Sequence, residues 1–96
     1  MYRLLRIARK DKTALAGYEQ DDYVLPSEAN NKSIEELIHE FTITRLYSIN
    51  LISSISDENL NNLGTASNSH VSARACAFIL LGHTVWHINI IKERYL

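Results

Sequence analysis

The sequence predicts an all-α fold in a single domain spanning residues 1–96, with about three helices and a long crossover loop. Apolar residues recur at helical spacing in three segments, at about 2–10, 34–55 and 73–94. A serine precedes each of the last two segments, Ser33 and Ser72, in the position of a helix N-cap. Polar stretches interrupted by glycine or proline separate the segments, and we interpret these stretches as the connections.

The first segment lacks a start signal. No serine, threonine, aspartate or asparagine precedes Tyr2, so the chain is expected to begin inside a helix. Arg9 and Lys10 suit the carbonyl end of that helix, because basic side chains interact favourably with its dipole there.

The crossover, Asp11 to Lys32, is expected to be a loop because it contains Gly17, Pro26 and polar clusters. Loops of this length are uncommon in compact domains and often functional, so one reading places it beside a substrate. The other reading is a plain crossover anchored by its apolar residues. Those anchors would be Tyr18, Tyr23, Val24 and Leu25, and the acidic residues Glu19, Asp21 and Asp22 would form a solvated rim.

The second segment opens with a Ser-Ile-Glu-Glu capping box, in which Ser33 caps the helix and Glu36 reaches back. One apolar stripe follows at helical spacing, and His39 points away from it, toward solvent. The stripe consists of Ile34, Leu37, Ile38, Phe41, Ile52 and Ile55. After it, Ser56 to Gly64 is expected to be a connector in which Leu60 and Leu63 pack inward, and Thr65 to His70 a polar loop.

The last segment carries His83 and His87, four residues apart. At this spacing two imidazoles lie one turn apart on the same helix face, where both can reach one ion, which is half of a metal site. Apolar residues share that face, namely Cys76, Ile79, Leu80 and Ile90. The alternative is a pair of core histidines hydrogen-bonded to neighbours, because a buried imidazole needs a partner.

The sequence also allows a prediction for each of three residues around the pair. Gly82 predicts a close approach or a packing constraint, since glycine weakens a helix interior. Cys76 is interpreted as a core residue. His70 precedes His83 by thirteen residues, about 20 Å along a helix, so it is not expected to join the pair.

Composition limits the classes of function. The chain is 46% hydrophobic and 22% charged, with a net charge of −1, which is typical of a soluble globular protein and disfavours nucleic acid as a partner. No apolar run reaches the roughly 20 residues that a membrane span needs, and the first residues do not have the pattern of a signal peptide. The single cysteine cannot form an internal disulfide, so a cytoplasmic location is expected.

Three segments together resemble the DinB/YfiT-like superfamily of four-helix-bundle metal-binding proteins. They are YRLLRIARKDKTALAGYEQDDYV, SIEELIHEFTITR and GTASNSHVSARACAFILLGHTVWHINIIKERYL, and they cover essentially the whole chain. The GHxxxH element is the most specific part. The resemblance implies a partial up-down four-helix bundle in which His83 and His87 are metal ligands. In this family a third histidine comes from a segment that would precede Met1.

The resemblance also implies a function. Family members with known activities are metal-dependent thiol S-transferases, isomerases that use a low-molecular-weight thiol, and hydrolase-like enzymes. We therefore expect weak binding of zinc or nickel, ancestry in a metal-dependent transferase or hydrolase, and a low-molecular-weight thiol or other small molecule as substrate. Apolar surface left by an incomplete bundle predicts a homodimer. A non-catalytic dimerising helical module, or a truncated fragment of such an enzyme, is the alternative, and the coding DNA upstream of Met1 distinguishes these readings.

Overall fold

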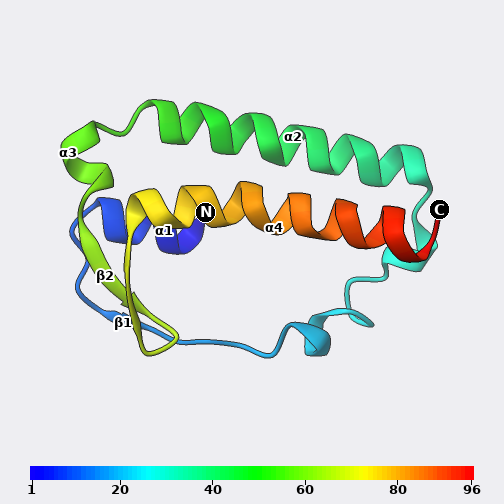
Figure 1. The fold of residues 1–96 in the computed structure, drawn as a ribbon, viewed down its shortest axis with the longest axis horizontal. Coiled ribbons are helices and arrows are strands. Elements are labelled where there is room, and N and C mark those ends of the chain that lie inside the picture. Colours follow the sequence, from blue (N-terminus) through cyan, green and yellow to red (C-terminus); the bar gives the residue numbers. More distant parts are fainter.

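The computed structural model describes residues 1–96, and two long antiparallel helices dominate it (Figure 1). In chain order the elements are α1 (Tyr2–Ala8), β1 (Ala14–Leu15), the 3-10 helices η1 (Gln20–Tyr23) and η2 (Ala29–Asn31), α2 (Ile34–Ser53), α3 (Asp57–Leu60), β2 (Leu63–Ala66), β3 (Ser69–Ser72) and α4 (Ala73–Arg94). Short α1 lies beside the first half of α4, and the strands lie at the same end of the molecule (Figure 1).

Helix α1 ends two residues earlier than expected, at Ala8. Lys10 adopts a left-handed backbone conformation with φ of 65°, which ends the helix. Asp11 then fixes the exit of the chain, because one carboxylate oxygen accepts from Arg6 Nε at 2.6 Å and the other from the Thr13 N–H at 2.8 Å. These bonds, first from Thr13 and then from Arg6, lower the pKa of Asp11 to about 2.

This pKa predicts an acid-sensitive contribution to stability. Because the pKa is lowered in the folded state, the contribution is complete above the ordinary pKa of about 3.9 and disappears as the pH falls through about 2. The difference in melting temperature between the wild type and Asp11→Asn should be constant above about pH 4 and shrink toward pH 2. A difference that does not change with pH would contradict this assignment.

Helix α2 begins as predicted. The Ser33 hydroxyl accepts from the Glu36 N–H, and the Glu36 carboxylate accepts from the Ser33 N–H, so the capping box is confirmed. The helix ends at Ser53. Near that end Ser48 is buried and the half-buried Ile52 packs on the core, and farther back Leu37 of the stripe is half-buried. At the other end Ile34 and Phe41 are exposed. His39 faces solvent, as expected.

The expected polar loop over residues 65–70 is wrong, because this region forms a β-hairpin. Strands β2 and β3 pair antiparallel across a two-residue turn, Ser67 and Asn68, both of which have positive φ. Strand β1 adds in parallel to β2, with Ala14 opposite Thr65. The mostly helical class is confirmed, but the chain also carries a three-stranded sheet and is not purely α-helical; a four-helix bundle is not confirmed.

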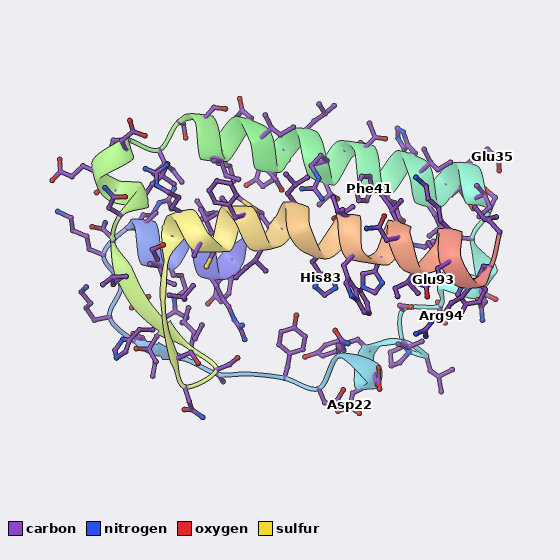
Figure 2. The ribbon with its side chains drawn as sticks, in the orientation of Figure 1. Asp22, Glu35, Phe41, His83, Glu93 and Arg94 are labelled. Atoms are coloured by element: carbon purple, nitrogen blue, oxygen red, sulfur yellow. The ribbon has the colours of Figure 1, made fainter.

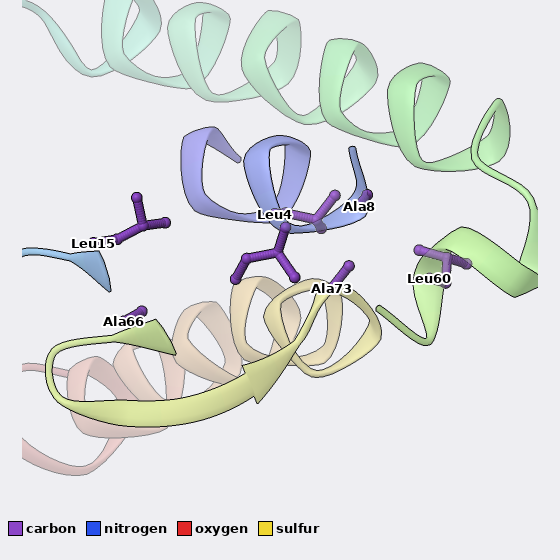
Figure 3. Close-up of a cluster of buried hydrophobic side chains, with 7 residues drawn as sticks. Leu4, Ala8, Leu15, Leu60, Ala66 and Ala73 are labelled. Atoms are coloured by element: carbon purple, nitrogen blue, oxygen red, sulfur yellow. The ribbon is translucent and has the colours of Figure 1, made fainter. Parts of the chain in front are cut away.

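The core lies where α1, the sheet and the start of α4 meet (Figure 3). Leu4 and Ile7 are its largest fully buried side chains. The buried cluster comprises Leu4, Ile7, Ala8, Leu15, Leu60, Ala66 and Ala73. Leu60 packs inward as expected, whereas Leu63 is exposed. Glycine is needed at position 64, because a Cβ there would stand 2.5 Å from Ile7 Cγ1.

The crossover between β1 and α2 is not anchored as one reading of the sequence expected. Its apolar residues, Tyr18, Tyr23, Val24 and Leu25, are all exposed. Tyr18 instead packs edge-on against Tyr23 and lies under the Arg3 guanidinium. The acidic residues Glu19, Asp21 and Asp22 are also exposed, as expected of a solvated rim.

Helix α4 corrects one expectation about membranes. Over Ala73–Arg94 it has the length and the apolar composition of a membrane span, with a mean hydropathy of 1.3 over 18 residues. The sequence shows no single apolar run there, because glycine, histidine, threonine and asparagine interrupt the apolar residues. Length and composition alone do not separate a membrane helix from a helix that packs against protein.

Candidate metal centre

Helix α4 brings His83 and His87 together. The two Nε2 atoms are 2.8 Å apart, so one ring donates its N–H to the lone pair of the other. Trp86 lies against both rings, with ring centroids 6.4 Å from His83 and 4.9 Å from His87. Figure 2 shows His83 on the side of α4 that faces the crossover segment bearing Asp22. The two nitrogens therefore point at each other in a hydrogen bond.

The surroundings of this pair differ from the expected apolar burial. Both histidines are exposed, although Cys76, Leu80 and Ile90 on the same face are half-buried. The expected reason for Gly82 is also absent: a Cβ at this position would meet no atom within 4 Å. The two imidazoles are hydrogen-bonded to each other, but not inside a buried core. They form an open pair on the surface of the chain.

The pair fits a metal ion in the chemistry and separation of its atoms. Zinc binds imidazole nitrogens at about 2.0 to 2.1 Å, so two nitrogens on one ion lie less than about 4.2 Å apart. The two Nε2 atoms are 2.8 Å apart in a hydrogen bond, so the exposed side chains have to separate by about 0.5 Å to hold a tetrahedral zinc ion between them. No third histidine, cysteine, aspartate or glutamate of the chain joins them. One chain therefore offers two ligands.

Two residues considered near the pair do not join it. His70 lies on β3, opposite Thr65, and faces the same cavity as His83 without forming a group of three ligands. Cys76 is half-buried and packs on the core, as expected. Burial raises the pKa of its thiol, which favours the unreactive protonated form.

A cavity of about 1110 Å³ opens beside His83. Its walls come from α1, the sheet, the start of the crossover, α2 and α4, and most of the residues that line it are apolar. The charged side chains in the wall are Arg3, Arg6 and Arg45, and no aspartate or glutamate lines it. The cavity therefore suits a molecule with an apolar body and an anionic group.

Two of these arginines have no carboxylate partner, because the only ion pair in the wall joins Arg6 to Asp11. Arg3 Nη2 donates to the Ala16 carbonyl at 2.6 Å. Arg45 Nη2 donates to Thr84 Oγ1 at 2.8 Å, and its guanidinium lies over Phe41. Each guanidinium keeps further N–H donors in the fork geometry that binds carboxylates and phosphates.

A sequence model of the DinB superfamily matches residues 1–91. The chain belongs to the DinB superfamily. No curated protein and no protein of solved structure matches it significantly.

Arg45 is one of the cavity residues that sequence reasoning missed. On the helical wheel it lies about 20° from Ile34, inside the apolar stripe of α2. A charged residue at a stripe position is a signal, because a guanidinium placed there must find polar partners. In the structure it links α2 to α4 one residue after His83 and reaches the cavity wall.

Proposed function

We propose that this DinB-superfamily chain is a metal-binding protein in which His83 and His87 hold a divalent ion, zinc or nickel, at the mouth of a cavity for a small anionic molecule. The observation that carries the proposal is the 2.8 Å separation of the two Nε2 atoms beside that cavity. With one ligand fewer than the usual three, we expect weaker binding than in a closed site.

The proposed chemistry is metal-dependent thiol transfer or hydrolysis. A bound divalent ion with an open position would supply an activated thiol or water as the nucleophile. The residues of the chain position the other reactant: Arg3 and Arg45 bind its anionic group, and Trp86 shields one side of the imidazole pair. A low-molecular-weight thiol that carries carboxylates fits this distribution of charge. Because the ion would be held by only two protein ligands, we expect turnover below the usual range of about 1 to 10³ s⁻¹.

Calorimetric titration with zinc tests metal binding. We expect the wild type to bind the ion and His83→Ala and His87→Ala each to lose most of the affinity. His39→Ala is the matched control, since His39 is an exposed histidine on the solvent side of α2 and should leave the titration unchanged. Equal zinc uptake by the wild type and the His83, His87 double variant would refute the proposal.

A non-catalytic dimerising helical module is the second candidate. The exposed apolar surface of α2 and α4 favours it, because such surface on a soluble chain marks an interaction site. The two candidates differ in their response to zinc: only the first predicts thiol transfer or ester hydrolysis that depends on His83. For either candidate we propose a cytoplasmic location, given the single free cysteine, Cys76.

A further inference from the structure

Helix α1 covers only part of α4. With seven residues it is about 10 Å long, whereas the 22 residues of α4 extend about 33 Å. Ala73, Ala77 and Leu80 pack on the core that α1 helps to form, and no residue of α4 beyond Leu80 reaches that core. The next residues on the same side of the helix, Thr84, His87 and Ile91, do not reach that core, which leaves about 20 Å of α4 that α1 does not cover.

Part of α2 is also left uncovered. On the side of α2 that carries the apolar stripe, most residues far from the core are exposed, although Leu37 is half-buried. Ser48 is 5% exposed, Phe41 52%, Ile38 60% and Ile34 66%. The uncovered half of α2 lies beside the uncovered half of α4, because the two helices run antiparallel (Figure 1). Together they form one apolar surface, which we call the open layer: Ile34, Ile38, Phe41, Thr84, His87 and Ile91.

The accessible surface of the whole chain is larger than that of a compact monomer of the same mass. The chain exposes 7691 Å², whereas a compact monomer of its mass exposes about 5,600 Å². Its radius of gyration is 15.3 Å, against about 12.5 Å for a compact domain of the same length. The excess of about 2,100 Å² is within the roughly 1,000 to 2,500 Å² that each subunit of an obligate dimer buries.

We propose that a second copy of this chain covers the open layer, and that the two copies form a symmetric dimer whose centre is a four-helix arrangement of two α2 and two α4 helices. The open layer can pair with a copy of itself, because four of its six residues are apolar and none is a carboxylate or a lysine. A two-fold axis there places the His83 and His87 pairs of both copies at one interface.

The consequence for the metal centre is a shared site. Two ligands from each copy give four imidazoles, which is the coordination number that zinc takes in closed structural sites. A shared ion would therefore stabilise the dimer, and the open position that transfer or hydrolysis needs would exist only where an ion is held by a single chain. This part rests on the proposed metal function, whereas the dimer itself does not. The expected stoichiometry is therefore one ion for two chains.

Sedimentation velocity in EDTA tests the interface alone. We expect the wild type to sediment as a dimer at micromolar concentration and Ile38→Asp to sediment as a monomer. Ile43→Asp is the matched control: Ile43 is 54% exposed, close to the 60% of Ile38, but lies on the opposite side of α2. Circular dichroism checks that each variant is helical. If Ile38→Asp does not fold, the melting temperature of the wild type is measured at several protein concentrations. It should rise with concentration if the wild type is a dimer.

Zinc titration followed by sedimentation tests the shared site. We expect saturation at one ion for two chains, and we expect the His83→Ala, His87→Ala double variant to lose zinc uptake but to remain a dimer. A wild type that dimerises without binding zinc overturns the metal function and leaves the interface standing.

Other results overturn the interface. These are a folded wild-type monomer with a melting temperature independent of concentration, or dissociation by Ile43→Asp but not by Ile38→Asp. Flotation of the wild type with phosphatidylcholine vesicles in place of dimerisation would assign the apolar surface to a membrane instead. One zinc ion bound by each chain of the dimer would overturn the shared site.

Discussion

Replacing Leu4 by alanine is expected to destabilise the protein by about 2 to 5 kcal/mol, because it leaves a cavity that the surrounding residues cannot close. Leu4 is 0% exposed, and only Ile7 is a comparably large and fully buried side chain. With so small a core, a loss of this size is a large fraction of the stability of a domain, roughly 5 to 15 kcal/mol. Urea denaturation at fixed protein concentration measures it.

The control for Leu4→Ala is Leu46→Ala, which removes the same atoms from an exposed position on α2. Surface substitutions of this kind usually change stability by less than about 0.5 kcal/mol. If both variants lose the same stability, the core is not where the structure places it.

Gly64→Ala is expected to be the second most damaging substitution, at about 1 to 3 kcal/mol, through overpacking. The added Cβ would stand 2.5 Å from Ile7 Cγ1 and 3.1 Å from its Cδ1. Ile7 is fully buried, so it cannot rotate away without displacing its neighbours. The shift in the urea midpoint reports the effect.

Gly82→Ala makes the same chemical change, and its effect on stability is expected to be the opposite. A Cβ at position 82 meets nothing within 4 Å, and alanine favours a helix interior over glycine by about 1 kcal/mol. We therefore expect Gly82→Ala to stabilise the protein while Gly64→Ala destabilises it. Destabilisation by both would mean that Gly82 faces a partner that the isolated chain lacks.

Local signals in the sequence predict the long helices well. Ser33 and Glu36 satisfy each other at the start of α2, and the Ser72 hydroxyl accepts from the Ala75 N–H at the start of α4. These bonds join residues three apart, so both partners of each bond lie within one short segment of the sequence. The proximity of His83 and His87 follows from helix geometry in the same way.

Features that depend on distant residues escaped prediction. Strand β1 has two residues, and it is a strand only because Ala14 and Leu15 meet residues 65 and 66. The hairpin turn at Ser67 and Asn68 lacks the glycine that usually signals such a turn. Exposure of the imidazole pair depends on which distant segments pack on α4, which no local pattern reveals.

The way the core joins distant segments determines when it can form. The Asn62 side chain donates to the Ala8 carbonyl, 54 residues away, and the Lys12 ammonium donates to the Leu63 carbonyl, 51 residues away. During synthesis α1 leaves the ribosome first, yet its packing partners in β2 and α4 are made last. Helix α2 can form early from local contacts but contributes no side chain larger than Ser48 to the buried core. Folding therefore waits for the final quarter of the chain, and a nascent chain that stalls before α4 holds α1 without a surface to fold against.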